Sequence, residues 1–307
     1  MPLRGDKLLG IHVSPSAPDM EAAVLDTGAR LESAEFADGI VCVHDDVEWL
    51  RGVVGRNKGL RWVQLGAAGI DQWLDADVMR PTITWTAAKG VHATPMAEHV
   101  IALVYCAAKG LAVAARRTRW GELAVSSVAG SVLGVVGAGL AGRAIVDLAR
   151  ANGMQTIALT RRGGDTGADV SLGANGLSWL LARADIVVQS CPLTDETRGM
   201  IGDREFAGMK RGAWLINVGR GAVVDTDALL RALDGGRLAG ALLDVTDPEP
   251  LPSGHALWAR PNVLITPHVA STPAMGRPAL VALVAENTRR LMRGDALIGV
   301  VDLVAGY

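Results

Sequence analysis

The sequence of 307 residues has little cysteine, no large excess of charge and no apolar run long enough for a membrane span. Its three cysteines, Cys42, Cys106 and Cys191, are widely spaced and form no C-x-x-C pair. They therefore indicate neither a disulfide framework nor a zinc site. The formal net charge of −2 argues against a general binder of nucleic acid or of acidic membranes.

The most apolar region, 99–115, is interrupted by Lys109 and Gly110, so it predicts a buried helix. The first residues, MPLRGDKLLGIHVS, contain too short an apolar stretch for a signal peptide. We therefore expect a cytoplasmic protein without membrane or nucleic-acid partners. No metal site is predicted, because the histidines other than His268 show no metal-ligand spacing. They are His12, His44, His92, His99 and His255.

Short β-rich runs alternate with Ala- and Leu-rich helical stretches, a pattern typical of parallel sheets with crossover helices. The length favours about two domains, and a hydrophobic content of 50% supplies ample material for large cores. In the first half, strands are predicted at 8–13, 40–43, 62–65 and 83–85. A long apolar helix is predicted next, with Thr94 as N-cap, Pro95 in the first helical position and an end near Ala108.

The second half predicts six further strands, which with their helices fit a doubly wound dinucleotide-binding domain. These strands are expected at 132–136, 156–159, 186–189, 214–217, 240–244 and 263–265. A last helix, from Pro278 to about Arg293, has no strand left to pair with in that domain. We expect it to return and pack on the first half.

The segment VLGVVGAGLAGRAI contains a G-x-G-x-x-G pattern made by Gly137, Gly139 and Gly142. The first glycine permits a tight turn, the second lets the backbone approach a pyrophosphate, and the third lets the helix lie close to the strand. The following helix, which should end at Gly153, offers free N–H groups to phosphates. A tight turn that binds nothing has the same glycines, but the strand–helix–strand order favours nucleotide binding.

The next strand, QTIAL, leads into Thr160, Arg161 and Arg162. NAD-specific sites usually carry an acidic residue here, which accepts hydrogen bonds from the adenosine ribose hydroxyls. Thr160 stands in its place, and planar guanidinium groups suit a 2′-phosphate. We therefore predict NADP as the preferred cofactor, with NAD as the alternative. The competing interpretation is an exposed turn whose charges are only solvated.

Three later segments carry ionisable residues just after predicted strands, at the sheet edge where ligands bind. INVGRG contains Arg220, LLDVTDPEP contains Asp244 and Glu249, and ITPH contains His268. A single arginine or histidine is more often a structural residue. Three such positions on successive strand ends indicate a reaction site.

The chemistry of these side chains fits together. Hydride transfer at a carbonyl carbon must be matched by proton transfer at its oxygen, and histidine is the natural proton carrier near neutral pH. Glu249 would favour the protonated imidazolium of His268 and orient its ring. Arg220 would polarise the carbonyl and bind the substrate carboxylate through charge-assisted hydrogen bonds.

With these residues in place, the sequence resembles the D-isomer-specific 2-hydroxyacid dehydrogenase family, close to glyoxylate/hydroxypyruvate reductases. The resemblance extends from about Leu60 to Asn287, and the residues before it match only loosely. It rests on RWVQLGAAGID, MAEHVIAL, GVVGAGLAG, ADIVVQSCPLTDETRGMIG, INVGRGAVVD, LLDVTDPEP and PNVLITPHVAS.

The resemblance implies two doubly wound parallel-sheet domains with the active site in the cleft between them. A flavodoxin-like substrate domain would comprise 1–94 and 275–307, and a Rossmann NAD(P)-binding domain would comprise 95–274. A homodimer joined through the nucleotide domain is also implied.

The resemblance further implies Arg220, Glu249 and His268 as the catalytic trio. The expected cofactor-binding residues are Gly137, Gly139, Leu140, Ala141, Gly142, Thr160, Arg161, Arg162, Cys191, Pro192, Thr197, Val218, Gly219 and Asp244. The expected substrate-binding residues are Ala67, Ala68, Gly69, Arg220 and His268.

Two departures bear on these expectations. Leu140 and Ala141 stand where the family often has a basic residue followed by isoleucine. Formate-oxidising relatives carry Gln where Glu249 stands, so formate is not the expected substrate. We predict an NADPH-preferring reductase of small 2-oxo acids such as glyoxylate or hydroxypyruvate. The alternatives are a non-catalytic NAD(P)-dependent sensor, as among corepressor relatives, and an enzyme resembling D-3-phosphoglycerate dehydrogenase.

Overall fold

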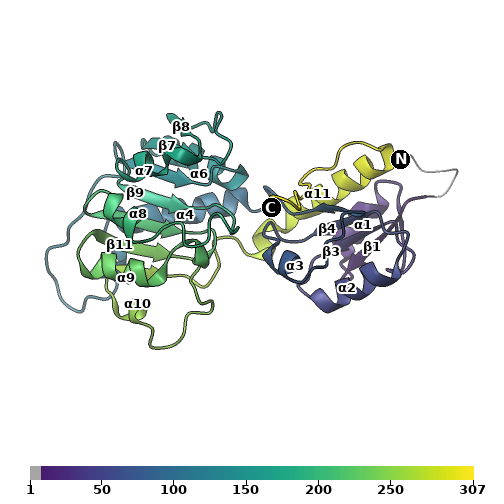
Figure 1. Cartoon of the computed structure of the whole chain (residues 1–307), viewed down its shortest axis with the longest axis horizontal. Helices are drawn as coiled ribbons and strands as arrows, with labels where there is room; N and C mark the ends of the chain where they lie inside the picture. Colours follow the sequence, from purple (N-terminus) through teal and green to yellow (C-terminus); the bar gives the residue numbers. More distant parts are fainter. Residues whose placement is uncertain (1–7) are drawn as a thin grey trace. The chain divides into compact units, whose positions relative to one another are not determined.

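The computed structural model describes residues 8–307, which form two compact units. Unit 1 comprises the chain up to His92 together with Pro273–Tyr307, and unit 2 comprises Ala93–Thr272. Each unit is built on one parallel β-sheet with helices packed against it (Figure 1). The predicted α/β class with two doubly wound sheets is confirmed.

The sheet of unit 1 has the order β2-β1-β3-β4-β5, which is the flavodoxin-like order. Its strands are β1 (Gly10–Ser14), β2 (Arg30–Leu31), β3 (Gly39–Cys42), β4 (Trp62–Leu65) and β5 (Thr84–Thr86). Its helices are α1 (Pro18–Leu25), α2 (Val47–Arg56), α3 (Asp71–Asp75) and α11 (Pro273–Arg293). The two-residue strand β2 is not among the predicted strands.

Helices bury both faces of this sheet. Successive residues of a strand point to opposite sides, so neighbouring residues pack in different cores. Ile40 packs in a core with Leu50 and Val53 of α2. Its neighbour Val41 packs in a second core with Met20 of α1 and Leu280 of α11. β3 (GIVC) is an uninterrupted apolar run and β4 (WVQL) is interrupted only by Gln64, which explains why both strands can be predicted from the sequence.

Helix α11 is longer than expected. It begins at Pro273, so Pro278 lies inside the helix and not at its start. The proline removes one helical hydrogen bond near the first turn. Two contacts with the rest of unit 1 hold the N-terminal part of α11. Leu280 is buried in the core beside α1, and Nε of Arg277 donates to Asp19 at 2.8 Å. That guanidinium lowers the pKa of Asp19 to about 2.

The sheet of unit 2 has the order β12-β11-β10-β9-β6-β7-β8, which is the Rossmann order with a seventh strand added at one edge. Its strands are β6 (Val132–Val136), β7 (Gln155–Leu159), β8 (Val170–Leu172), β9 (Ile186–Gln189), β10 (Ala213–Asn217), β11 (Leu238–Leu243) and β12 (Val263–Ile265). The strand β8 is additional to the six predicted.

Helices cover both faces of this sheet. They are α4 (Ala93–Ala108), α5 (Leu111–Ala114), α6 (Leu140–Ala151), α7 (Leu177–Leu181), α8 (Asp203–Gly208), α9 (Thr226–Asp234) and α10 (Ala256–Ala259). Val188 packs in a core with α4 and α6, and its neighbour Val187 packs in a core with α7, α8 and α9. Helix α4 begins at Ala93, so Thr94 and Pro95 lie in its first turn and the expected N-cap is two residues too late.

Candidate active site

Three of the predicted site residues follow neighbouring strands of unit 2. Arg220 comes three residues after β10, Glu249 lies in the loop that follows β11, and His268 comes three residues after β12. β11 pairs in parallel with both β10 and β12, and the last residues of the three strands are in register. The three side chains therefore start from one edge of the sheet.

Glu249 and His268 are hydrogen bonded, with Nδ1 of the ring 2.7 Å from Oε1 of the carboxylate. An ionised carboxylate only accepts, so Nδ1 carries the proton. Among the described residues, Nε2 has no hydrogen-bond partner. The side chain of His268 is 53% exposed and that of Glu249 is 42% exposed. The pair is thus open to a ligand while the orientation of the ring is fixed.

The backbone of His268 is in the left-handed region, with φ of 54°, which costs a non-glycine residue about 1–3 kcal/mol. Asp244 holds this conformation. Its carboxylate accepts from the N–H groups of Val269 and Ala270 at 2.9 Å each, and from the hydroxyl of Thr266 at 2.6 Å. Its carbonyl oxygen accepts from the N–H of His268 at 2.9 Å. Asp244 therefore fixes the chain on both sides of the histidine.

The side chain of Asp244 is only 1% exposed and lies 3.6 Å from Nε2 of His99. This ring nitrogen also lies 3.3 Å from the hydroxyl of Thr266. The sequence analysis expects Asp244 in the cofactor site and assigns no role to Thr266 or His99. For the contacts among Asp244, Thr266 and His99, the only hint in the sequence is that Thr266 lies two residues before the predicted acid–base residue His268.

Arg220 precedes a one-turn 3₁₀ helix, Gly221–Val223. Gly221 packs so closely on the loop after β11 that a Cβ there would lie 1.9 Å from the carbonyl oxygen of Thr246. The loop between Thr246 and Glu249 is held in turn, since the N–H of Thr246 donates to Oε2 of Glu249 at 3.4 Å. The turn that carries Arg220 therefore contacts the loop that carries Glu249.

The glycine-rich turn follows β6. Gly137 has φ of 101°, and a Cβ there would lie 2.4 Å from the backbone nitrogen of Cys191. A Cβ at Gly142 would lie 2.3 Å from the carbonyl oxygen of Gly137. A Cβ at Gly139, by contrast, would meet nothing within 4 Å. The first and third glycines are thus required by the protein's own packing, and the second leaves the open space that a phosphate needs.

Helix α6 begins directly after Gly139 and ends before Gly153, which has φ of 75° as the predicted helix end requires. In the described part of the chain, the N–H groups of Leu140, Ala141 and Gly142 have no acceptor, as expected for a first helical turn. Free backbone N–H groups beside Gly139, which has open space around it, are suited to bind a pyrophosphate.

Thr160 follows β7 and adjoins this turn, because the N–H groups of Gly137 and Ala138 both donate to the carbonyl oxygen of Leu159. The hydroxyl of Thr160 donates to the carbonyl of Gly163 at 3.0 Å. Arg161 and Arg162 are exposed, and Gly163 and Gly164 have φ of 71° and 96°. The two arginines therefore lie on a glycine-closed turn at the strand end.

Gln189, the last residue of β9, organises the loops after β9 and β10. Its Nε2 lies 3.1 Å from both the carbonyl oxygen and Sγ of Cys191, and burial raises the pKa of that thiol. A Cβ at Gly219 would lie 2.3 Å from Oε1 of Gln189. The sequence analysis does not single out this glutamine, whose signal is one polar residue ending the apolar run IVVQ. Of the other residues expected here, Val218 is buried, and the hydroxyl of Thr197 donates to the carbonyl of Pro192.

The loop expected to hold the substrate carboxylate follows β4 in unit 1. Ala67 and Ala68 are exposed, and the carbonyl oxygen of Ala67 accepts from the N–H of Ala88 at 2.9 Å. Within residues 8–307, the N–H groups of Ala67, Ala68 and Gly69 have no acceptor. Successive free backbone N–H groups of this kind form anion-binding concavities.

The described residues contain no group of three or more His, Cys, Asp or Glu side chains that could hold a metal ion. From residue 8 to the end of the chain, no helix has both the length and the apolar character needed to cross a membrane.

Known proteins are similar to this chain in sequence and in fold. A family model described as "D-isomer specific 2-hydroxyacid dehydrogenase, NAD binding domain" matches residues 101–270. A glyoxylate reductase of Aeropyrum pernix is 36% identical over 249 residues, which cover 76% of this chain and 74% of that protein.

Two crystal structures show the same architecture over nearly the whole chain. A D-isomer specific 2-hydroxyacid dehydrogenase from Xanthobacter autotrophicus Py2, in complex with NADPH and MES, is 30% identical with a TM-score of 0.86, covering 98% of this chain and 100% of that one. An NADPH-dependent glyoxylate/hydroxypyruvate reductase from Sinorhizobium meliloti, in complex with NADP and sulfate, is 27% identical with a TM-score of 0.82, covering 97% and 99%.

Proposed function

This chain belongs to the D-isomer specific 2-hydroxyacid dehydrogenase family, and from that premise we propose that it reduces small 2-oxo acids, such as glyoxylate or hydroxypyruvate, with NADPH as the preferred reductant. It is an NAD(P)-dependent oxidoreductase. The observation that carries the proposal is the hydrogen bond between Glu249 and His268, because it gives the sheet edge an oriented acid–base group.

In the reductive direction, the imidazolium of His268 donates its Nε2 proton to the carbonyl oxygen of the substrate. In the oxidative direction, the neutral ring accepts the hydroxyl proton at the same atom. Glu249 accepts from Nδ1 in both states, so it keeps the ring oriented and stabilises its positive charge. When bound at this sheet edge, a nicotinamide cofactor would supply the hydride in reduction and accept it in oxidation.

Arg220 and the 67–69 loop are proposed to bind the substrate. The guanidinium group of Arg220 donates to the carbonyl oxygen and to one carboxylate oxygen, which polarises the carbonyl for attack. The free N–H groups of Ala67, Ala68 and Gly69 accommodate the carboxylate. We accordingly assign unit 1 as the substrate domain and unit 2 as the NAD(P)-binding domain.

The cofactor is proposed to bind along the carboxyl edge of the unit 2 sheet. The N-terminus of α6 and Gly139 take the pyrophosphate, and Thr160 with Arg161 and Arg162 takes the adenosine ribose and its 2′-phosphate. The loops after β9, β10 and β11 adjoin the nicotinamide ribose, through Cys191, Pro192, Thr197, Val218, Gly219 and Asp244. Asp244 contributes through the loop that it holds around His268.

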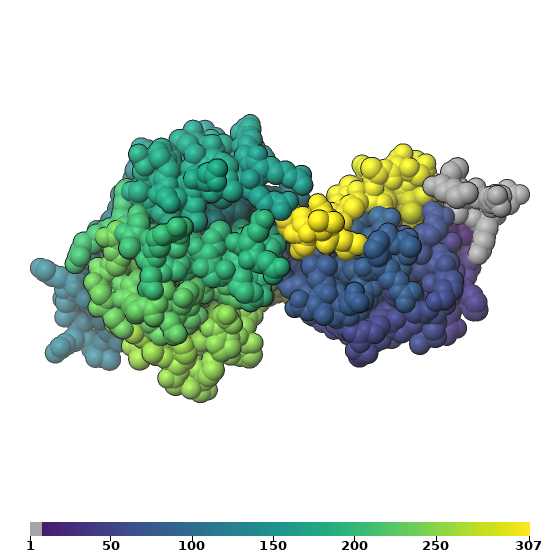
Figure 2. All heavy atoms as spheres, viewed as in Figure 1, coloured from purple at the N-terminus to yellow at the C-terminus, as the bar shows by residue number. Residues whose placement is uncertain are grey.

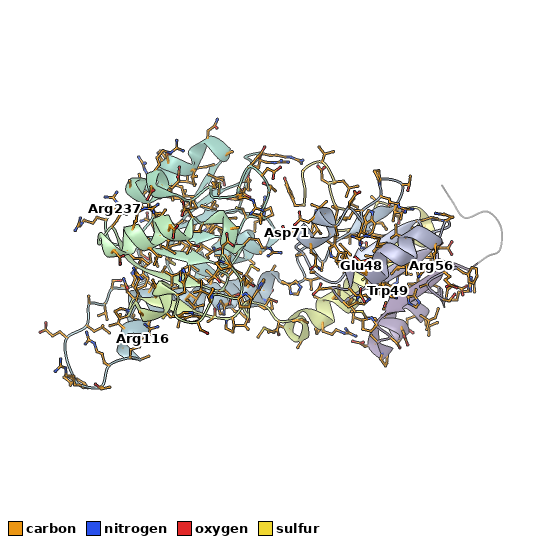
Figure 3. All side chains as sticks on the ribbon, turned by 60° about the horizontal axis from the view of Figure 1, so that its bottom comes forward. Glu48, Trp49, Arg56, Asp71, Arg116 and Arg237 are labelled. Carbon is orange, nitrogen blue, oxygen red and sulfur yellow. The ribbon has the colours of Figure 1, made fainter. Side chains whose placement is uncertain are left out.

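We further propose that the protein is a homodimer. Between α5 and β6 the chain forms no helix or strand, and Trp120 in this segment is fully exposed. Figure 2 shows the segment projecting from unit 2, and Figure 3 shows Arg116 at its base. Arg116 anchors it by donating to the carbonyl oxygen of Val263 at 3.1 Å. An anchored arm with an exposed tryptophan suits contact with a second copy of the chain. Light scattering should give a dimer mass for the wild type and a monomer mass for Trp120→Asp.

The proposed function is tested by the loss of NADPH absorbance with a panel of 2-oxo acids. Glyoxylate, hydroxypyruvate, pyruvate and 3-phosphohydroxypyruvate separate the predicted reductase from a phosphoglycerate dehydrogenase-like enzyme. We expect the first two to have the highest kcat/KM. The proposal fails if none of the four is reduced by purified protein that binds NADPH.

A further inference from the structure

His99 of α4 contacts the two side chains that hold the loop of His268. Its Nε2 lies 3.3 Å from the hydroxyl oxygen of Thr266 and 3.6 Å from Oδ1 of Asp244. The side chain of His99 is largely buried, with 18% of it exposed. The ring thus lies beside the proposed acid–base loop, although the proposed mechanism gives it no role.

The hydrogen bonds around Thr266 fix which group donates. An ionised carboxylate only accepts, so the hydrogen bond of 2.6 Å between Thr266 and Asp244 uses the single hydroxyl proton of the threonine. Toward His99 the same hydroxyl oxygen can therefore only accept, and Nε2 of His99 must carry a proton. His99, Thr266 and Asp244 thus form a chain in which each side chain donates to the next.

This chain of hydrogen bonds ends on the backbone around His268. Oδ1 of Asp244 accepts from the N–H of Val269, and Oδ2 accepts from the N–H of Ala270, at 2.9 Å each. The carbonyl oxygen of Asp244 accepts from the N–H of His268 at 2.9 Å. A change in the orientation of this carboxylate would therefore move the backbone that sets the direction of the His268 side chain.

Helix α4 holds the ring of His99 in a fixed place. Val100, the next residue, is fully buried in a core that also contains Leu242 and Ala270. Leu242 lies two residues before Asp244, and Ala270 lies two residues after His268. The helix therefore packs in one core with both chain segments that the ring contacts, and His99 can support the loop from outside it.

We infer that His99 is a positioning residue for the proposed acid–base group: by donating to Thr266 it orients the Asp244 carboxylate, which holds the backbone around His268. This inference rests on the proposed function of His268. It assigns to His99 an effect on the rate of the chemical step, with little effect on the affinity for NADPH.

The test compares three substitutions of His99 that differ in where they place a donor. The amide of His99→Gln can reach the place of Nε2, the shorter amide of His99→Asn reaches only the place of Nδ1, and His99→Leu has no donor. The rate of a single turnover with saturating glyoxylate should fall about tenfold in His99→Leu and His99→Asn, because a misdirected acid–base group loses part of its effect.

His99→Gln is the matched control, because it carries the same amide as His99→Asn at the other position. Its single-turnover rate should stay within about threefold of the wild type, and the Kd for NADPH should change less than about threefold in all three variants. Equal losses of rate in His99→Gln and His99→Asn would contradict the role of a donor at Nε2.

Thr266→Val tests whether His99 acts through the threonine, because valine is close in shape but has no hydroxyl. If the chain of donors is correct, the effects of His99→Leu and Thr266→Val should not add. The double variant should then turn over no more slowly than Thr266→Val alone. Fully additive losses would contradict an action of His99 through Thr266.

Amide hydrogen exchange separates this inference from the proposed function, because it requires neither substrate nor turnover. Deuterium uptake at Val269 and Ala270 should be at least about threefold faster in His99→Leu and His99→Asn than in the wild type and His99→Gln, because the hold on these N–H groups is loosened. A wild type that reduces none of the 2-oxo acids would refute the proposed function and leave the exchange rates to decide on His99. Unchanged exchange in a folded His99→Leu protein would show that His99 does not hold the loop.

Discussion

Glu249 orients His268 through a hydrogen bond of 2.7 Å to Nδ1, while the backbone of the histidine adopts φ of 54°. The carboxylate thus fixes the ring from one side, and the left-handed backbone sets the direction in which the side chain leaves the loop. Backbone strain of this kind persists only where surrounding contacts over-determine it. The pair therefore combines a fixed tautomer with a fixed direction, as an acid–base group requires.

Replacing His268 should abolish most of the reductive activity. Asparagine is the suitable substitution, since it tolerates the left-handed backbone better than alanine. His268→Asn should lower kcat/KM for glyoxylate by roughly 10²–10⁴-fold, the usual contribution of general acid–base catalysis. Stopped-flow reduction and NADPH titration by fluorescence would measure the two properties separately. Near-normal turnover in a folded variant with unchanged NADPH affinity would remove His268 from the mechanism.

Arg220→Lys should weaken substrate binding more than cofactor binding. Lysine keeps the positive charge but loses the planar fork that bonds two oxygens at once. Losing one charge-assisted hydrogen bond, about 1.5–3 kcal/mol, should raise the KM for glyoxylate about tenfold or more and also lower kcat. Steady-state kinetics with both substrates varied would show this. A change confined to the KM for NADPH would instead make Arg220 a nucleotide ligand.

Asp244→Asn should damage both stability and catalysis. The buried carboxylate accepts from two backbone N–H groups and one hydroxyl, and an amide nitrogen in place of one oxygen would face these donors. Each buried donor left without an acceptor costs about 1–3 kcal/mol, so the free energy of unfolding should fall by at least that amount. The kcat should fall as well, because the loop around His268 relaxes. Asp227→Asn, on the exposed first turn of α9, is the matched control, and equal losses in both variants would contradict the role given to Asp244.

Burial of Cys42 predicts a loss of stability at alkaline pH. The pKa of its thiol is raised from 9.0 to about 12, chiefly by burial. Between these values the unfolded chain releases the proton while the folded protein retains it, so unfolding becomes more favourable as pH rises. The free energy of unfolding should decline by up to about 1.4 kcal/mol per pH unit from this group. Urea titrations at several alkaline pH values should show a shallower decline in Cys42→Ala, and identical slopes would show that the thiol does not contribute.

Much of the fold is readable from the sequence because most strands are continuous apolar runs. The strand β2 is missed since Arg30–Leu31 is too short to show a pattern, and β8 is missed since Val170–Leu172 is largely exposed. The start of α11 is placed five residues too late because Pro278 is typical of a first helical position. Contacts of α11 with Asp19 and with the core of unit 1 stabilise the part of the helix around Pro278, so that the helix begins before this proline. No local sequence signal predicts these contacts.

The candidate site can be predicted in part for a different reason. The sequence places Arg220, Glu249 and His268 together because parallel strands bring their carboxyl ends to one edge. The contacts that hold their loops are not predicted. The hold of Asp244 on 266–270 depends on loop backbone angles, and the packing of Gly221 on Thr246 joins two loops that are remote in sequence. Such contacts are set by packing and carry no periodicity.

The preference for NADPH is the last prediction, and it depends on the strand end at Thr160. A carboxylate there would accept from both ribose hydroxyls of NADH and repel a 2′-phosphate, whereas Thr160 cannot repel it. The exposed Arg161 and Arg162 can form charge-assisted bonds to the phosphate, each worth roughly 1.5–3 kcal/mol. Even one such bond favours NADPH by about tenfold or more. Arg161 should matter more than Arg162, because it directly follows the strand-end position.

The measurement is kcat/KM for NADPH and NADH in the wild type, in Thr160→Asp/Arg161→Ala, and in Arg162→Ala as the matched arginine control. The double variant should shift toward NADH and the control should shift little; a wild type that prefers NADH, or a double variant with no shift, would mean that the two arginines form only a solvated surface turn.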